Sequence, residues 1–131
     1  MPINPQKSGQ YRFAIVEDEP AIAQLVNDML LSSGAKVEVF TGSAAFLKST
    51  NLLQFRSVVL DLSLPDVDGF ELMEMLATKS KGMSVVLMSG HDIAIVRAAK
   101  VYGNAIGLNV RAALTKPFSR DELFAGLGLS I

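Results

Sequence analysis

The sequence contains no cysteine, which excludes disulfide bridges, thiolate metal sites and cysteine nucleophiles. A chain without cysteine fits a reducing compartment, so we expect a cytoplasmic protein. The sequence also has little excess charge, since 12 basic residues against 13 acidic ones give a formal net charge of −1 at pH 7. No overall field therefore draws this chain to nucleic acid or to an anionic membrane, and we expect neither as a partner.

Long apolar runs are missing as well. No run approaches the roughly 18 residues that a membrane-spanning helix needs, and residues 1–10 lack the apolar stretch of a signal peptide. Length and composition instead favour one folded domain, because the chain has 131 residues, of which 50% are hydrophobic and 19% are charged. We expect residues 1–10 to form a flexible N-terminal tail and residues 11–131 to form the domain.

From residue 11 onward, short apolar runs alternate with longer segments of helical spacing, which is typical of a parallel sheet covered by helices on both faces. The expected strands are residues 12–16, 36–40, 57–60, 84–88 and 110–115. The first, third and fourth are almost continuously apolar, as strands buried on both faces are. The second alternates apolar and polar residues, so we expect it at an edge of the sheet.

Helices are expected between and after these strands. The first begins at Pro20 and ends by Gly34, because apolar residues recur between them at intervals of three and four. A short second helix is expected at 44–51 and a fourth at 92–102. The third and fifth helices are opened by two capping pairs, Asp68 with Glu71 and Ser119 with Glu122.

Polar side chains follow four of the five expected strands. In an open parallel sheet, ligands bind beyond the carboxyl ends of the strands, so these side chains should meet at one edge. They are Glu17, Asp18 and Glu19 after the first strand, Asp61 at the end of the third, Ser89 after the fourth and Lys116 after the fifth. The sequence therefore predicts a charged site at this edge of the sheet.

The chemistry of such a cluster follows from its charge. Neighbouring carboxylates repel one another unless a cation lies among them, and an all-oxygen set favours Mg²⁺. We expect Asp18 and Asp61 to be direct ligands and Glu17 to act through water. An aspartate can also attack phosphorus, and Asp61 is placed for this, with Lys116 and Ser89 holding the phosphoryl oxygens.

Ordinary solvated acids are the alternative interpretation, because acids at helix starts interact favourably with the helix dipole in any protein. We accept that interpretation for Glu19. For the other residues, their coincidence at four strand ends of one sheet favours a functional site.

These residues resemble the receiver domain of two-component response regulators, over residues 11–129. The matching segments are AIVEDEP at 14–20, DLSLPDVDGFEL at 61–72, MSG at 88–90 and TKPF at 115–118. The resemblance implies a flavodoxin-like (βα)5 fold, a doubly wound five-stranded parallel sheet with strand order 2-1-3-4-5.

The resemblance also implies roles for individual residues. Asp61 matches the phosphoacceptor, which is phosphorylated by a sensor histidine kinase or a phosphotransfer protein. Mg²⁺ would be held by Asp18, Asp61 and the main-chain carbonyl of Ser63, while Ser89 and Lys116 would contact the phosphate. The bond between Lys116 and the proline after it is usually cis in the family. The implied chemistry is limited to self-phosphorylation and self-dephosphorylation, so we expect a signalling domain and not an enzyme.

Two positions depart from the family pattern. Glu17 stands where aspartate is commoner, and Ala113 stands where a tyrosine or phenylalanine usually works with the hydroxyl residue, here Ser89, as a conformational switch. These departures keep open a pseudo-receiver, which is an interaction module independent of phosphate. An aspartyl-phosphate phosphatase or mutase is disfavoured, because the acid that such enzymes carry two residues after the nucleophile is here Ser63.

The segment from Ser89 onward bears on how the domain would pass its signal to another domain or protein. Ser89 and Lys116 lie 27 positions apart, farther than in most receivers, and this segment resembles receivers joined to cyclic-di-GMP phosphodiesterase domains. The chain is either a stand-alone receiver or, as we favour, a piece of a larger regulator with an output domain or target protein. The family's usual output and dimerisation face runs from the fourth to the fifth helix, where the apolar candidates are Ile93, Ile95, Val96 and Val101.

Overall fold

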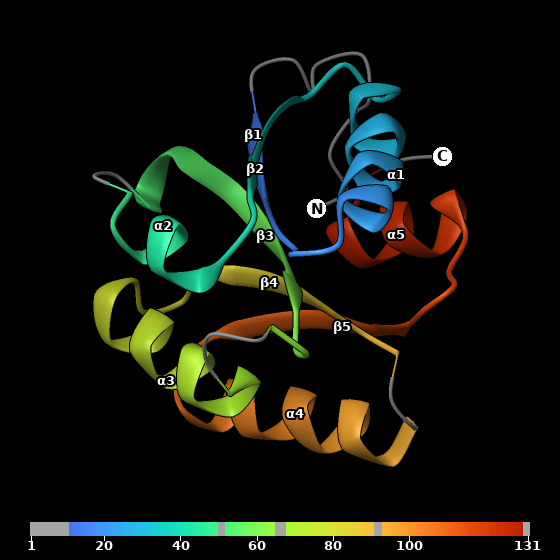
Figure 1. Ribbon diagram of the computed structural model, residues 1–131. Helices are drawn as coiled ribbons and strands as arrows, with labels where there is room; N and C mark the ends of the chain where they lie inside the picture. The colour runs from blue at the N-terminus through green and yellow to red at the C-terminus, as the bar shows by residue number, and fades with distance from the viewer. Residues whose placement is uncertain (1–10, 50–51, 65–67, 91–92, 130–131) are drawn as a thin grey trace.

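The computed structural model describes residues 11–49, 52–64, 68–90 and 93–129, and the predicted tail at 1–10 lies outside them. The described chain forms a parallel five-stranded sheet in the order β2-β1-β3-β4-β5, which confirms the expected strand order (Figure 1). The strands are β1 (Arg12–Val16), β2 (Lys36–Phe40), β3 (Phe55–Asp61), β4 (Ser84–Ser89) and β5 (Asn109–Thr115).

Strand burial follows the sequence pattern. Four of the five residues of β1 and six of the seven residues of β3 are buried, because helices cover both faces of these inner strands. β2 lies at an edge, as its alternating sequence predicted. The bounds of β1 and β2 match the prediction, whereas β3 begins two residues earlier and ends one residue later than expected.

Helices cover the two faces unequally. One face carries α1 (Pro20–Leu31) and α5 (Arg120–Leu127), and the other carries α2 (Ser43–Leu47), α3 (Gly69–Lys79) and α4 (Ile93–Ala105) (Figure 1). Each face encloses its own apolar core. On the second face, the ring of Phe40 contacts Phe46 and Phe55 edge-on, with centroids 5.3 and 6.0 Å away.

Both predicted helix caps are present. The Asp68 side chain accepts hydrogen bonds from the backbone N–H groups of Phe70 and Glu71. Ser119 and Glu122 form a reciprocal capping box at the start of α5. The local hydrogen bonding that these side-chain types allow was therefore enough to locate two helix starts.

Two helix lengths were predicted wrongly. The second helix, expected at 44–51, ends at Leu47, and a 3-10 turn (Leu52–Gln54) precedes β3. The fourth helix runs to Ala105 and not to 102, since Ile106 N–H still bonds the Tyr102 carbonyl before Gly107 turns to a φ of +105°. Its expected start at Asp92 lies outside the described residues.

Among the helices described here, none is long and apolar enough to cross a membrane.

Candidate functional site

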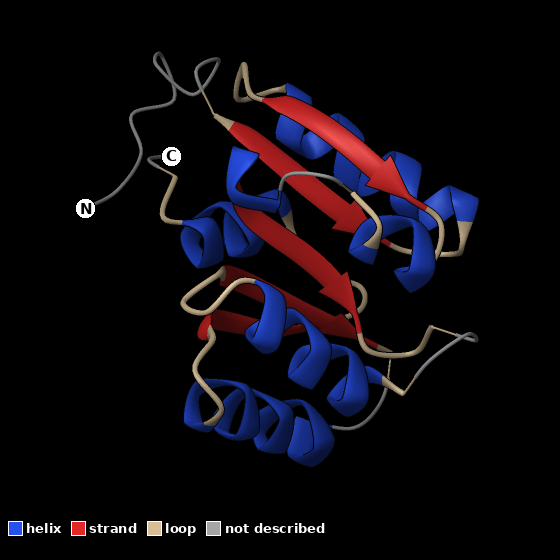
Figure 2. Ribbon diagram, turned by 90° about the vertical axis from the view of Figure 1, so that its left-hand side faces the viewer, coloured by secondary structure: helices blue, strands red, loops and turns tan. Residues whose placement is uncertain are grey.

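The carboxyl ends of β1, β3, β4 and β5 bring the predicted site residues to one edge of the sheet, where the strand arrows of Figure 2 point. Asp61 is the last residue of β3 and pairs with Met88 of β4. The Leu62 N–H then donates to the Met88 carbonyl at 3.0 Å, which fixes the backbone immediately after Asp61. Ser89 ends β4 and pairs with the last residue of β5, directly before Lys116.

Glu17, Asp18 and Asp61 form the acidic cluster that the sequence predicted. Each offers a carboxylate oxygen, and these three atoms lie within 4.8 Å of one another. Glu17 and Asp61 are buried, at 0% and 1% exposure, while Asp18 is half-buried and opens the cluster to solvent. The set consists only of hard oxygen donors, so it suits Mg²⁺ and offers nothing for a soft metal.

The two oxygens of Asp61 have different surroundings. Oδ1 accepts a hydrogen bond from the Ser63 N–H at 3.0 Å and lies 3.5 Å from Lys116 Nζ. Oδ2 is buried and has no hydrogen-bond partner among the described residues. A buried carboxylate oxygen is rarely left this way, because losing its water without replacement is costly. The arrangement therefore leaves Oδ2 available to a cation or an electrophile. A buried oxygen of this kind is what a metal site requires, so the acidic cluster fits a bound metal ion.

Lys116 lies between two of the acids. Its Nζ bonds Glu17 Oε1 at 2.5 Å, and its backbone N–H donates to the Ser89 carbonyl at 2.8 Å. The peptide bond that follows is cis, in agreement with the resemblance. The sequence predicts that Lys116 holds phosphoryl oxygens, but it does not predict the ion pair of Lys116 with Glu17. The only signal in the sequence was that a cation and an acid both follow strands of one sheet.

Burial and charge act against each other at this ion pair. The pKa of Glu17 is raised from 4.5 to about 7, chiefly by burial and next by the neighbouring Asp61 carboxylate, which together outweigh the lowering effect of Lys116. Burial lowers the pKa of Lys116, but the hydrogen bond to Glu17 and the charge of Asp61 outweigh burial and raise it overall. The site therefore holds more negative charge than one lysine neutralises, which favours an added cation.

The remaining predicted residues lie around this cluster. Ser89 is fully buried at the end of β4. Ser63 is exposed and contacts Asp61 through its backbone N–H. Glu19 is exposed, as its interpretation as a solvated acid requires, although its backbone N–H donates to Glu17 Oε2 at 3.4 Å. Ala113 pairs with Leu87 and packs against the core beneath α3 and α4.

The candidate output face divides clearly by exposure. On α4, the side chains of Ile93, Ile95 and Val101 are 55%, 44% and 71% exposed. Val96 is 1% exposed and belongs to the core. Spacing alone had left this division open.

Comparisons with known proteins agree on the family of this fold. A family model described as the response regulator receiver domain matches residues 13–127. Transcriptional regulatory protein TcrA of Mycobacterium tuberculosis is 32% identical over 116 residues, which are 88% of this chain and 44% of that protein. Transcriptional regulatory protein FixJ of Bradyrhizobium diazoefficiens is 31% identical over 112 residues, 85% of this chain and 52% of that protein. The chain spans about half the length of these curated relatives.

Solved structures give the same result. A response regulator from Colwellia psychrerythraea superposes with a TM-score of 0.78 at 31% identity, covering 90% of this chain and 94% of that one. Full-length FixJ from B. japonicum superposes with a TM-score of 0.76 at 28% identity, covering 91% of this chain and 56% of that one.

Proposed function

This chain belongs to the response regulator receiver domain family, and from that membership we propose that Asp61 is the residue that accepts the phosphoryl group. The chain is a receiver domain of two-component response regulators, a signalling module. We assign the receiver to residues 11–131 and its action to the cytoplasm. We further propose that the donor is a phosphohistidine on a sensor kinase or a phosphotransfer protein, and that the chain catalyses nothing beyond its own phosphorylation and dephosphorylation.

The observation that carries this proposal is the buried Oδ2 of Asp61, to which no residue that the structure describes donates a hydrogen bond. The Ser63 N–H holds the other oxygen of the same carboxylate, so the side chain is oriented with Oδ2 available. Oδ2 attacks phosphorus and forms a new P–O bond. The P–N bond to the histidine breaks, and its electron pair stays on the imidazole nitrogen. The product is an aspartyl phosphate.

The acidic cluster supports Mg²⁺ as the cofactor of this step. We propose that Asp18, Asp61 and the Ser63 main-chain carbonyl bind it directly, and that Glu17 contacts it through water. Bound there, the ion supplies positive charge that offsets the negative charge on the transferring oxygens. Glu17 fits the outer position, because its Oε1 already bonds Lys116 and its Oε2 accepts from the Glu19 backbone.

Lys116 and Ser89 would hold the transferred group. Lys116 Nζ lies 3.5 Å from Asp61 Oδ1, so a small movement away from Glu17 brings the ammonium onto a phosphoryl oxygen. Such a charge-assisted contact is stronger than a neutral hydrogen bond. Ser89 is buried at the end of β4, one residue beyond the strand partner of Asp61, and this position supports its hydroxyl as the group that responds to phosphorylation.

We propose that phosphorylation changes the face formed by α4, β5 and α5, through which the domain contacts an output domain or target protein and forms a homodimer. The exposed Ile93, Ile95 and Val101 support this face as an interaction surface. Ala113 carries no ring that could turn inward, so the signal from Ser89 passes through the packing between β5 and α4. The relatives that extend about twice as far support an output partner on the same polypeptide.

Intact mass after incubation with acetyl phosphate tests the assignment of Asp61. With Mg²⁺, the wild type should gain one phosphate, and without Mg²⁺ it should gain none. Asp61→Asn removes the nucleophile and should gain none in either condition. Asp68→Asn is the matched control, because Asn also caps helices and Asp68 lies outside the acidic cluster. Lys116→Ala should slow uptake without abolishing it.

Equal labelling of Asp61→Asn and the wild type would defeat the assignment. A folded wild type that gains no phosphate from acetyl phosphate should be tested next with a phosphorylated histidine kinase. Failure of that transfer as well would favour the pseudo-receiver, a module that interacts independently of phosphate.

A further inference from the structure

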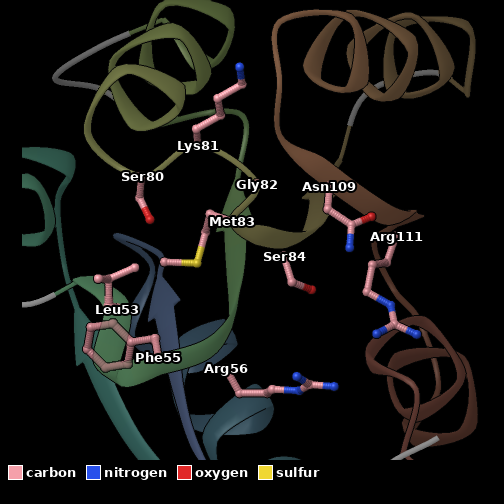
Figure 3. Close-up of a pocket in the computed structure, with 10 residues that line it drawn as sticks. All are labelled: Leu53, Phe55, Arg56, Ser80, Lys81, Gly82, Met83, Ser84, Asn109 and Arg111. Atoms are coloured by element: carbon pink, nitrogen blue, oxygen red, sulfur yellow. The ribbon is translucent and has the colours of Figure 1, made fainter. Parts of the chain in front are cut away.

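A pocket lies at the opposite edge of the sheet from Asp61, where β3, β4 and β5 begin (Figure 3). It has a volume of about 270 Å³ and includes three cationic residues, Arg56, Lys81 and Arg111, in its lining. None of the described residues that line it is acidic. Small-molecule sites usually enclose about 300–1,000 Å³, so this pocket suits a small ligand of negative charge.

Arg56 reaches this pocket because of an irregularity in β3. The β1 residue Arg12 pairs with Phe55. The next β1 residue, Phe13, pairs with Ser57. Arg56 is therefore an extra residue, skipped by the pairing between these strands, as at a β-bulge.

Arg111 occupies an equivalent position in β5. Val85 of β4 pairs with Val110, and the next residue, Val86, pairs with Ala112. The pairing skips Arg111, so it too is the extra residue of a bulge. Val110 and Ala112 consequently pack into cores on opposite faces of the sheet, although regular alternation would place them on the same face.

Both bulges place an arginine in the lining of the same pocket. A bulge redirects a side chain out of the regular alternation of its strand, and bulges are over-represented beside functional sites. Here two independent bulges each insert an arginine, and both arginines line the same pocket. Figure 3 shows their guanidinium groups on the same side, near Ser84 and Asn109, while the Lys81 ammonium points away.

No carboxylate of the described residues neutralises these arginines. Among the described residues, neither Arg56 nor Arg111 forms an ion pair. Arg56 lies over the ring of Tyr11, with its guanidinium carbon 5.6 Å from the ring centroid. Arg111 lies beside Gly128, where a Cβ atom would be 2.6 Å from its Nη2. Both side chains are thus supported by packing, and within the described part of the chain no acidic group pairs with either charge.

We propose that this pocket binds a small dianionic phosphate, either inorganic phosphate or a phosphate monoester. Guanidinium groups present paired N–H donors that match phosphate oxygens, and Arg56 and Arg111 supply two such groups. Ser84, whose Oγ accepts from the Ser57 hydroxyl at 2.8 Å, and the side-chain amide of Asn109 supply further donors. The site is separate from Asp61 and requires neither Mg²⁺ nor phosphorylation.

Residue-resolved NMR tests this proposal. Isotope-labelled wild type in EDTA at pH 7.5 is titrated with sodium phosphate at constant ionic strength, and the arginine Nε–H signals are followed. Arg56 and Arg111 should shift with a common saturating curve, whereas the exposed Arg97 of α4 should not follow it. A second titration with glycerol phosphate asks whether an ester substituent is accepted, and sodium sulfate asks whether any tetrahedral dianion suffices.

Variants distinguish specific binding in this pocket from non-specific attraction of phosphate to positive charge. Arg56→Gln and Arg111→Gln should each weaken phosphate binding about tenfold or more, as loss of a charge-assisted hydrogen bond predicts. Arg97→Gln removes the same charge elsewhere and should leave affinity within about twofold. Arg56→Gln is less apt to disturb folding than Arg111→Gln, because Arg56 is exposed and Arg111 is half-buried.

Non-saturating shifts of similar size at all arginines would overturn the proposal. So would equal affinity of Arg56→Gln and the wild type, or saturation confined to residues around Lys116. These measurements contain no Mg²⁺ and no phosphodonor, so their outcome is independent of whether Asp61 accepts phosphate.

Discussion

Glu17 is the residue at which burial and charge conflict most directly. Its side chain is inaccessible to solvent, and its pKa is raised from 4.5 to about 7 by burial and by Asp61. The folded state therefore holds a proton that the unfolded chain releases near pH 4.5. This contribution to stability is complete below pH 4.5, falls as the pH rises through about 7, and is lost above that value.

We therefore expect metal-free wild type to lose stability between pH 5 and pH 8, and Glu17→Gln to lose about 1–3 kcal/mol less over the same interval. Gln cannot ionise but can still accept a hydrogen bond from Lys116. Urea unfolding in EDTA at several pH values measures this difference. Glu19→Gln is the control, because it removes the same charge from an exposed neighbour. Identical pH slopes for the two variants would contradict the interpretation of Glu17.

The site residues were predictable one by one, but their pairing was not. Topology alone places Asp61, Ser89 and Lys116 at one edge, because each follows a strand of the same parallel sheet. The Glu17–Lys116 ion pair joins the ends of β1 and β5, which are separated in the sheet by β3 and β4. Whether side chains reach across that distance depends on sheet twist and rotamers, which the sequence pattern does not encode.

At the scale of elements, local signals were the most informative. The caps at Asp68 and Ser119 involve residues within three positions of one another, so they could be located from sequence. The second helix was predicted too long, because its buried apolar residue, Phe46, packs against Phe40 and Phe55, and this tertiary contact has no local sequence signal. The two bulges were not predicted, since one extra residue in a strand leaves too little trace in its hydrophobic pattern.

Gly103 sets how closely α4 approaches β5. A Cβ atom at this position would lie 2.6 Å from Val110 Cγ2 and 3.1 Å from Met73 Sδ, and both neighbours are core side chains. Alanine is the better helix former by about 1 kcal/mol, but overpacking costs about 1–3 kcal/mol. We expect Gly103→Ala to lower the free energy of unfolding by about 1 kcal/mol in urea titrations.

Val110→Ala provides the matched test of this packing, because it removes the methyl group that the new Cβ would meet. In the double variant, Gly103→Ala should be neutral or stabilising. A coupling of about 1 kcal/mol or more is therefore expected from the four unfolding free energies. Additive effects would show that the contact between α4 and β5 does not limit this position.

The whole molecule separates charges that its composition hides. The formal net charge of −1 is a sum over two different edges of the sheet. The edge at the carboxyl ends of the strands is acidic, and the edge at their amino ends carries cationic residues. The acidic edge includes Glu17, Asp18 and Asp61, and the amino edge includes Arg12 and Arg56. A divalent cation and a phosphate dianion are thus expected at opposite edges, and neither could be inferred from net charge.

From the repulsion expected at the acidic edge, we predict that the stability of the whole fold depends on Mg²⁺. A ligand that binds only the folded state at 100 times its Kd adds about 2.7 kcal/mol to the free energy of unfolding. Wild type should gain this amount in urea unfolding at saturating Mg²⁺. Asp18→Asn should lose most of the gain, yet in EDTA it should be at least as stable as wild type, because it removes one of three mutually repelling carboxylates.

Asp68→Asn should keep the full gain from Mg²⁺, since it changes an equal charge outside the cluster. An equal gain in Asp18→Asn and wild type would remove Asp18 from the metal site. The opposite signs expected for Asp18→Asn in EDTA and in Mg²⁺ are the sharper criterion. A residue that merely supported the fold would destabilise the protein in both solutions when replaced, whereas a ligand held in a repelling cluster is unfavourable until its cation binds.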